Sequence, residues 1–521
     1  MSSSPNRIVK NTFFLYGKML ITIFFTLYTT RLVLKSLGVV DYGVFGVIGG
    51  AVNMLGFLSA SMAATTQRFM SYSEGTGNLE DKRQVFNVSV ILHFIIAICV
   101  CLLLCSFSYL FFDKIINVPV ERLYAAKVVY YSMVFSVTVT VLSVPYDAVI
   151  NSHENMLYYS IVGIIDSFVK LIIAIYIATS VSGDKLIVYG ILMAVLSIVV
   201  MIVMQIYCHK YYSECVFKPL TYFSKKKLKQ MSSFASWKLS TQFTSMVGNY
   251  GAGLLMNHYF GAVINAAISI ASQVISQLQS FSNNMIKAVN PAIVKSEGEN
   301  NRESMLQVSM YSCKYSFLIF AIFAAPALVC LDKLLVWWLV DVPQWAYLMT
   351  LVGILRSLNE CLLLPLETSI GATGKIRGNS FYSSLINIFP LLLLVILFYI
   401  GYSPMAYIVV SFSVWGIIYE LKTVYFAKKV CRLNIKIFFN EYIKKPYITF
   451  LFSVAWGLLV RFLLGDNILS ICTTIICVLG VFISLVYFYV MGMTEKKYAK
   501  NVVKNLSSTY KCNFLGADNK Q

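Results

Sequence analysis

The chain alternates long apolar runs with short polar segments from one end to the other. Each apolar run holds about twenty residues or more, so as an α-helix it can cross the roughly 30 Å of hydrocarbon in a bilayer. The segments between the runs leave no room for a separate soluble domain. The pattern predicts fourteen helices, at residues 11–33, 42–66, 85–112, 122–150, 157–181, 186–208, 231–256, 262–286, 307–331, 345–370, 379–400, 405–427, 446–464 and 468–492.

Composition agrees with an all-α integral membrane protein. Of the 521 residues, 58% are hydrophobic and 12% are charged, and the mean hydropathy is +0.73. Soluble globular domains have a charged fraction nearer a quarter. A soluble globule is therefore excluded, and the chain is expected to cross a membrane about fourteen times.

Lysine and arginine gather in every second loop and in both tails. Cytoplasmic loops carry the excess of these residues, so both termini are expected in the cytoplasm. The net charge of +19 follows from this arrangement and from attraction to anionic headgroups, without a nucleic-acid partner. Most of the twelve cysteines lie in predicted helices and there is no C-x-x-C motif, which predicts free thiols.

An internal repeat divides the sequence. The stretch SEGTGNLEDKRQV from Ser73 returns 223 residues later as SEGENNRESMLQV from Ser296, with seven matches in thirteen positions. The same shift places Gly38 on Gly261, each in a turn between the first two helices of its half. With shifts of a few residues, the segment Pro145–Asp147 meets Pro365–Glu367.

Because six helices separate the two copies, the repeats are expected to be parallel. Two six-helix lobes around a central cleft then follow, with two further helices at the C-terminal end, and the recurring Ser-Glu-Gly segment is expected to be a structural turn before a helix start. The predicted division is an N-terminal lobe at 1–212, a basic linker at 213–230, a C-terminal lobe at 231–430, two additional helices at 431–493 and a basic tail at 494–521.

This architecture resembles a known family. The turn glycines, the sequence Asp41-Tyr42-Gly43, the stretch RLVLKSLGVVDYGVFGVIGG from Arg31 to Gly50 and the two extra C-terminal helices are similar to the polysaccharide exporters of the multidrug/oligosaccharidyl-lipid/polysaccharide (MOP) superfamily. Within it, the chain is most similar to the Wzx-type flippases of O-antigen and capsule repeat units. The resemblance implies an undecaprenyl-diphosphate-linked oligosaccharide as substrate, a bacterial inner membrane, and a polysaccharide polymerase with its chain-length machinery as partners besides membrane lipids.

Polar residues within the predicted helices indicate where a cleft lies, because hydrocarbon does not tolerate them. They recur at helical spacing on the first, seventh and eighth helices, and the aromatic residues nearby are expected to be interfacial anchors. A chamber lined by hydroxyls, amides and a few cations suits a sugar that carries a phosphate. The candidate substrate-binding residues are Lys18, Thr22, Thr26, Lys238, Gln242, Asn249, Ser269, Gln273, Ser276, Asn283 and Lys287.

Charged residues in the helices have two interpretations each. Lys18 and Lys238 either bind a diphosphate from the inner leaflet or reach lipid headgroups. Asp147 and Glu367 are candidate inner-gate residues, through ion pairs with Lys18, Lys238 or loop cations, or they make ordinary helix-terminal pairs. Proton or sodium coupling through Asp166 or Glu360 competes with structural pairs at i, i+4 spacing, with Lys170 and Arg356 respectively.

The leading hypothesis is a flippase that moves the lipid-linked oligosaccharide to the outer leaflet by alternating access. A cation-coupled multidrug exporter of the same superfamily is the nearest alternative, and a membrane glycosyltransferase or polysaccharide polymerase is a weaker one. No catalytic triad, metal-ligand cluster or nucleotide motif is recognisable, and the loop Gly371–Asn379 lacks the spacing of a phosphate loop. The chain is therefore expected to be no enzyme and to need no cofactor besides the possible coupling ion.

Overall fold

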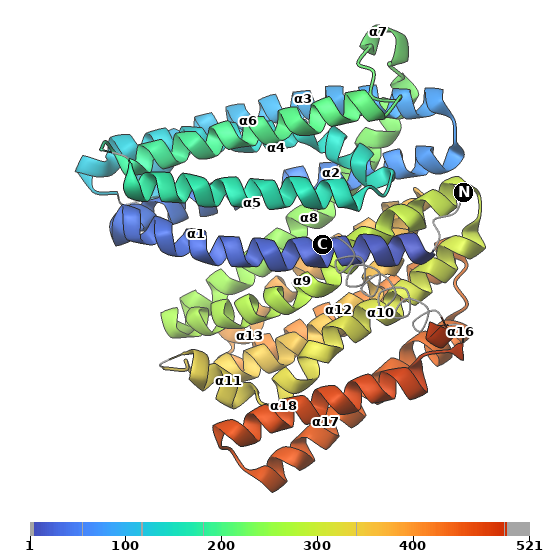
Figure 1. Cartoon of the computed structure of the whole chain (residues 1–521). Coiled ribbons are helices and arrows are strands. Elements are labelled where there is room, and N and C mark those ends of the chain that lie inside the picture. Colours follow the sequence, from blue (N-terminus) through green and yellow to red (C-terminus); the bar gives the residue numbers. More distant parts are fainter. Residues whose placement is uncertain are drawn as a thin grey trace, which may run out of the picture. The chain divides into compact units, whose positions relative to one another are not determined.

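The computed structural model describes residues 5–54, 56–115, 118–180, 182–339, 341–493 and 495–497. Over these ranges the chain is helical apart from its turns, which confirms the all-α fold (Figure 1). The last part of the predicted tail, residues 498–521, lies outside the described residues. The α-helices are α1 (Pro5–Met54), α2 (Gly56–Thr76), α3 (Leu79–Leu110), α4 (Leu123–Ser152), α5 (Met156–Thr179), α6 (Lys185–Tyr211), α7 (Pro219–Tyr222), α8 (Lys225–Phe260), α9 (Ala262–Gly298), α10 (Arg302–Val329), α11 (Leu331–Trp338), α12 (Ala346–Ala372), α13 (Arg377–Tyr399), α14 (Met405–Val410), α15 (Tyr419–Phe426), α16 (Ile435–Ile437), α17 (Lys444–Leu464) and α18 (Ile468–Leu485).

The long helices coincide with the predicted ones. Short π-helical segments join several of them into single spans, such as η3 (Ser411–Ile418) between α14 and α15 in the span Met405–Cys431. In the part of the chain that is described, eleven helices are long and apolar enough to cross a membrane, or twelve if the bent pair Val40–Val52 and Gly56–Thr76 is one span. The helices α8 and α9 do not reach this apolarity, because polar residues run along their length.

Several helices extend beyond the predicted ends, and in some of them a side-chain cap outside the apolar run sets the first turn. The side chain of Asn78 accepts hydrogen bonds from the backbone nitrogens of Glu80 (2.9 Å) and Asp81 (3.3 Å) and so starts α3 six residues early. Asp184 caps α6 in the same way, through the backbone nitrogens of Leu186 and Ile187. Such caps lie in polar sequence that carries no hydrophobic periodicity.

The two turn glycines have the same backbone conformation. Gly38, which breaks α1, has φ 80° and ψ 169°, and Gly261, between α8 and α9, has φ 81° and ψ −176°. Only glycine adopts this region of φ/ψ space readily. Positions 223 residues apart therefore share an unusual geometry, as expected of a duplicated unit.

The chain forms two compact units, which are described separately. Unit 1 comprises Met1–Gly261, Asn283–Ser312 and Leu363–Leu433, and unit 2 comprises Ala262–Ser282, Cys313–Leu362 and Asn434–Gln521. These units do not follow the predicted lobes, because their boundaries cut through α9, α10 and α12. The division into lobes stays a prediction.

In unit 1, long helices of the same repeat pack side by side. The helix α4 lies along α6, α1 lies along α5, and α8 lies along α13 (Figure 1). Large side chains such as Phe86 and Tyr130 are fully buried between them. The close approach of α8 to α13 depends on Gly248, where a Cβ would lie 2.6 Å from the carbonyl oxygen of Asn387.

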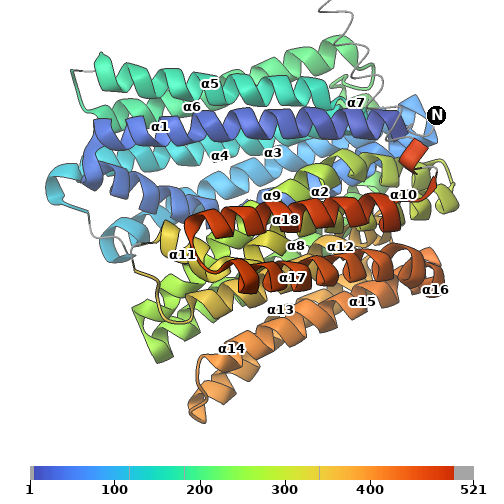
Figure 2. The same cartoon turned by 60° about the horizontal axis from the view of Figure 1, so that its bottom comes forward.

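In unit 2, α17 and α18 form an antiparallel pair (Figure 2). Gly457 of α17 lies against Val478 of α18 and Val329 of α10, with no space for a Cβ. The Arg461 guanidinium binds Asp332 through two hydrogen bonds of 2.6 Å. The two additional C-terminal helices are therefore attached to the rest of unit 2 by packing and by charge.

Candidate functional site

Two of the predicted binding lysines converge on one tyrosine in unit 1. Lys18 Nζ lies 4.1 Å from the ring centroid of Tyr159, and Lys287 Nζ lies 3.6 Å from the same centroid. Lys18 comes from α1, Tyr159 from α5 and Lys287 from the part of α9 in unit 1. The Lys18 side chain lies against Gly163, one turn beyond Tyr159, where a Cβ would overlap its end.

Asp147 supplies the negative charge near these lysines. It interacts electrostatically with Lys287, and it lies in α4 two residues after Pro145, whose ring removes a helix hydrogen bond. Its Oδ1 is buried and accepts no hydrogen bond from the residues that the structure describes. We call Lys18, Asp147, Tyr159 and Lys287 the first cluster.

The second repeat builds a related group, also in unit 1. Glu367 accepts hydrogen bonds from Lys422 Nζ at 2.7 Å, from Thr423 Oγ1 at 2.8 Å and from Asn379 Nδ2 at 2.8 Å. Lys238 of α8 interacts electrostatically with both Glu367 and Lys422. We call Lys238, Glu367 and Lys422 the second cluster.

The two clusters contain the same types of charged residue. They differ in how many hydrogen bonds the carboxylate accepts. Each contains one carboxylate and two lysines, so each carries a formal charge of +1. Lys18 and Lys238 lie at matching places in the repeats, as do Asp147 and Glu367. The Glu367 carboxylate is held by three donors, whereas Asp147 keeps an unpaired oxygen. The first cluster is therefore the better candidate for binding, and the second for holding the fold.

The remaining predicted binding residues lie mostly on exposed helix faces. In unit 1, Thr26, Gln242, Asn249 and Asn283 are exposed and Thr22 is half-buried, with its hydroxyl donating to the Met19 carbonyl at 3.0 Å. In unit 2, Ser269, Gln273 and Ser276 of α9 are exposed. Exposure is what a water-lined wall requires, because amides and hydroxyls are costly against hydrocarbon. Their contact with substrate stays a prediction.

The candidate coupling residues have different surroundings. In α5, Lys170 Nζ donates to Asp166 Oδ2 at 2.7 Å, so the expected i, i+4 pair forms. In unit 2, Glu360 Oε2 accepts a hydrogen bond of 3.1 Å from Gln279, and the predicted pair with Arg356 stays a prediction. Ion coupling through either carboxylate also stays a prediction.

The recurring Ser-Glu-Gly segments meet each other in unit 1. Gly75, near the end of α2, lies against the Lys295 carbonyl and the Cα of Gly298; Gly298, at the end of α9, lies against the Tyr72 carbonyl and the Cα of Gly75. A Cβ on either glycine would overlap the facing carbonyl. The contact is reciprocal, since Tyr72 matches Lys295 and Gly75 matches Gly298 in the repeat. We call it the glycine crossing.

An ion network surrounds the glycine crossing at the same end of the helices. Glu74 lies 2.5 Å from Lys82 and 4.0 Å from Lys295, and Arg7 lies 3.4 Å from Glu154. Helix starts (α1, α3) and helix ends (α2, α9) therefore meet here, as the predicted alternation of loops requires. We call this the basic end of unit 1.

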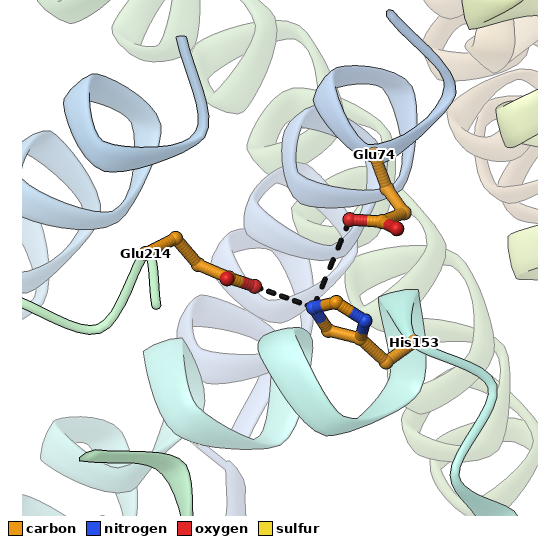
Figure 3. A group of neighbouring side chains, drawn as sticks. All are labelled: Glu74, His153 and Glu214. Atoms are coloured by element: carbon orange, nitrogen blue, oxygen red, sulfur yellow. Dashed lines mark hydrogen bonds and ion pairs between the residues drawn. The ribbon is translucent and has the colours of Figure 1, made fainter. Parts of the chain in front are cut away.

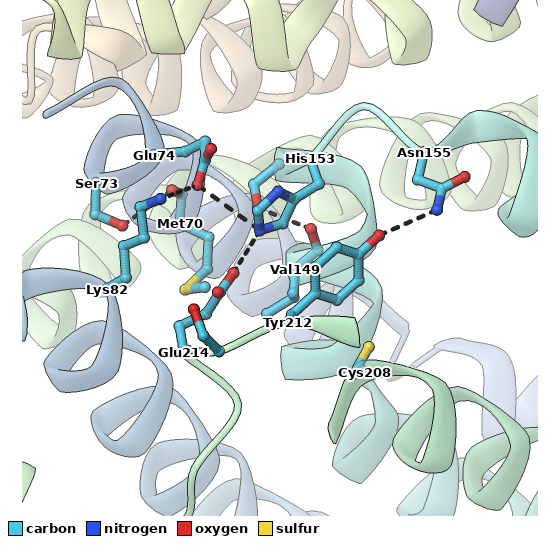
Figure 4. Close-up of polar contacts among 12 residues, drawn as sticks. Met70, Ser73, Glu74, Lys82, Val149, His153, Asn155, Cys208, Tyr212 and Glu214 are labelled. Carbon is cyan, nitrogen blue, oxygen red and sulfur yellow. Dashed lines mark hydrogen bonds and ion pairs between the residues drawn. The ribbon is translucent and has the colours of Figure 1, made fainter. Parts of the chain in front are cut away.

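Three residues of this network can hold a metal ion. Glu74, His153 and Glu214 place one ligand atom each within 4.8 Å of one another, from the end of α2, the α4–α5 turn and the segment after α6 (Figure 3). The Lys82 ammonium already lies at Glu74, and His153 Nε2 lies 2.5 Å from Glu214 (Figure 4). Because Lys82 and His153 already contact the carboxylate oxygens, we interpret the group as a polar network that ties three segments together.

The same contacts shift the pKa values of two carboxyl groups in this network. Burial would raise the pKa of Glu214, but the hydrogen bond and charge of His153 outweigh it and hold that pKa below its usual range. Burial raises the pKa of Glu154, with the Arg7 charge opposing the shift. The His153 ring stacks on Tyr212 at 4.3 Å, which fixes its direction toward Glu214.

Comparison with solved structures shows which fold the chain has, whereas the sequence comparisons find no match. No family model and no curated protein matches the sequence. Solved structures match over 83% of this chain and 96% of theirs: an outward-facing multidrug resistance MATE family transporter of the MOP superfamily, with 16% identity and a TM-score of 0.63; MATE in complex with MaD3S, with 14% identity and a TM-score of 0.66; and a MOP superfamily transporter from Pyrococcus furiosus whose binding pocket of reverse polarity suggests a different function, with 16% identity and a TM-score of 0.60. This chain has the fold of MATE transporters.

Sequence reasoning missed several members of these sites. Tyr159 joins Lys18 to Lys287, and Lys422 is the main partner of Glu367, which was expected to pair with Lys18, Lys238 or loop cations. A lysine inside the apolar span Met405–Cys431 was the available signal for Lys422. The network of Glu74, His153 and Glu214 brings together segments up to 140 residues apart, and no local spacing indicates it.

Proposed function

We propose that this chain is a transporter of the MOP superfamily that flips an undecaprenyl-diphosphate-linked oligosaccharide from the cytoplasmic to the outer leaflet of a bacterial inner membrane. The observation that carries the proposal is the first cluster, in which two ammonium groups face one aromatic ring beside a single carboxylate. The MATE-type fold supports transport, and the chemistry of the cluster supports an anionic headgroup.

Charge repulsion makes the first cluster receptive to a diphosphate. Lys18 and Lys287 lie within about 8 Å of each other, since both are near one ring centroid, and at an effective dielectric constant of 20 two like charges at that distance repel by about 2 kcal/mol. A diphosphate between them removes the repulsion and forms charge-assisted hydrogen bonds. Asp147 competes for Lys287, so the substrate is held and can still be released.

The polar faces of α1 and α8 would bind the sugars. Thr22 and Thr26 continue along α1 from Lys18, and Gln242 and Asn249 are exposed on α8. Hydroxyl and amide groups offer sugars many donors and acceptors of modest strength. In the proposed cycle, the glycine crossing opens to admit the headgroup from the cytoplasmic side and closes behind it.

The strongest alternative is a cation-coupled multidrug exporter of the same superfamily. The unpaired, buried Oδ1 of Asp147 favours it, because a carboxylate without a full set of donors can bind a cation or a proton. Two of the structures cited above are MATE proteins, one of them named for multidrug resistance. The two functions differ in the substrate that accumulates when the protein is absent.

Deletion of the gene is expected to leave lipid-linked repeat units accumulated in the cytoplasmic leaflet. Wild-type protein restores export, whereas Lys18→Gln and Lys287→Gln each reduce it by about tenfold or more, the effect of losing a charged hydrogen bond. Lys35→Gln is the matched control, because Lys35 is an exposed cation on the same helix as Lys18. Accumulated drugs with normal glycolipid export would contradict the flippase and favour the exporter.

A further inference from the structure

The segment that follows α6, together with the first residues of α8, presents apolar and basic side chains together. Phe217, Leu220 and Phe223 are 53%, 102% and 41% exposed. Four lysines in the same stretch are also exposed, namely Lys218, Lys225, Lys226 and Lys229. We call residues 217–229 the amphipathic loop. Apolar side chains that the fold leaves in the open indicate a surface that another apolar medium covers.

The amphipathic loop is held in place by α3. Asn87 Nδ2 donates to the Val216 carbonyl at 2.9 Å, and its Oδ1 accepts from the Lys218 backbone nitrogen at 2.9 Å. Arg83 Nη1 donates to the Tyr222 hydroxyl at 3.0 Å. These bonds hold Tyr222 against α3, while the side chains of Leu220 and Phe223 stay exposed.

The place of the loop in the fold decides what can cover it. It follows the apolar span Lys185–Tyr211 directly, so it starts where that helix leaves the hydrocarbon. In Figure 1 the short helix α7 stands at the edge of unit 1, and the contacts of its segment with α3 are made near the start of that helix. Lys227 of the same stretch pairs with Asp81 at 2.5 Å, which keeps the start of α8 at the basic end.

We propose that the amphipathic loop binds anionic phospholipids of the adjoining leaflet. Phe217, Leu220 and Phe223 insert at the level of the acyl chains, and the lysines contact the headgroup phosphates. Charge complementarity supports this occupant, since exposed lysines attract anionic lipid within a Debye length of the surface. An interfacial segment of this kind combines an apolar face with a lysine-rich one. The inference holds for a flippase or an exporter alike.

Amide hydrogen exchange of the full chain tests the proposal in nanodiscs. Exchange across residues 217–229 is compared between zwitterionic phosphatidylcholine and a mixture with phosphatidylglycerol. We expect at least about tenfold slower exchange in the anionic mixture, because several lysines near the surface add their attractions. The fourfold variant Lys218→Gln, Lys225→Gln, Lys226→Gln and Lys229→Gln is expected to abolish the difference.

Two further variants separate the contributions. Leu220→Ser removes the most exposed apolar side chain, without a buried contact to lose, and is expected to speed exchange in anionic nanodiscs. Lys375→Gln is the control, because Lys375 is an exposed loop cation whose neighbour Ile376 is buried. Equal exchange in both lipids, or protection that needs a soluble cytoplasmic protein, would overturn the proposal.

Discussion

The surroundings of single residues suggest a binding role for the first cluster and a structural role for the second. In both, a carboxylate two residues after a helix proline meets two lysines. The three donors around Glu367 occupy most of its acceptor sites, while one oxygen of Asp147 accepts no hydrogen bond from the described residues. The distinction gives opposite expectations for otherwise similar substitutions.

Lys422→Met is expected to lower the free energy of unfolding by about 3–5 kcal/mol, because it removes the cation that is hydrogen-bonded to the buried Glu367 carboxylate. Thermal unfolding of the detergent-solubilised protein measures the change. The double variant with Glu367→Gln should recover part of the loss, since the carboxylate that lost its hydrogen-bonded partner is then replaced by a neutral amide. A small effect of Lys422→Met, similar to that of Lys18→Met, would show that the second cluster does not hold the fold.

Asp147→Asn is expected to act on binding and turnover rather than on stability. Removal of its charge raises the first cluster from +1 to +2, so a diphosphate should bind more tightly and leave more slowly. We expect KM and kcat for flipping to fall together, each by about tenfold for a change near 1.4 kcal/mol. An unchanged KM would show that Asp147 does not compete with the substrate for Lys287.

At the scale of helices, the sequence predicts where each helix lies along the chain. It does not predict which side chains of different helices come into contact. The apolar runs locate every long helix, and the repeat locates Gly38, Gly261, Asp147 and Glu367 in matching places. Helix ends were missed where caps such as Asn78 lie in polar sequence. Tyr159 was missed because its partnership with Lys18 depends on α1 lying along α5, which no local spacing encodes.

The glycine crossing shows where the two copies of the repeated segment lie. It joins the first repeat to the second where the helices α2 and α9 end, and its tightness depends on two missing side chains. An added side-chain atom at either glycine would force the two segments apart, because close packing leaves no space for it. Under the proposed function, we expect this contact to separate during transport.

Gly75→Ala is expected to open the crossing, because its Cβ overlaps the Lys295 carbonyl. The readout is the reaction of Ser73→Cys, at a buried position, with a water-soluble maleimide. We expect a rate roughly fivefold to a hundredfold faster, since overpacking costs about 1–3 kcal/mol. Gly298→Ala should behave alike. Gly371→Ala, with open space around it, is the control, and an equal rate in all variants would refute the expectation.

At the scale of the whole molecule, charge at the basic end links stability to pH. The pKa of Glu214 is held below its usual range by His153, with Lys82 also nearby, while that of the neighbouring Glu154 is raised by burial. A lowered carboxylate pKa contributes stability that is present at neutral pH and is lost as the pH falls through the folded value. The raised pKa of Glu154 makes a contribution to stability with the opposite dependence on pH.

Glu214→Gln should therefore lower the unfolding temperature at pH 7, and its effect should shrink as the pH falls below about 4, where the wild-type carboxyl becomes protonated. Glu74, Lys82, Lys295 and Arg7 are the other charges of this network and are unchanged in the comparison. An effect of Glu214→Gln that is constant from pH 7 to about pH 3 would mean that its charge is not what stabilises the network.

The proposed function depends on recognition of a lipid-linked diphosphate by the first cluster. The most direct measurement is flipping of a fluorescent undecaprenyl-diphosphate-linked oligosaccharide in proteoliposomes that contain the purified full-length protein. Wild-type protein and Lys35→Gln should flip it, and the double variant Lys18→Gln with Lys287→Gln should not. Equal flipping by the double variant, or none by the wild type under conditions in which it exports cationic drugs, would contradict the account.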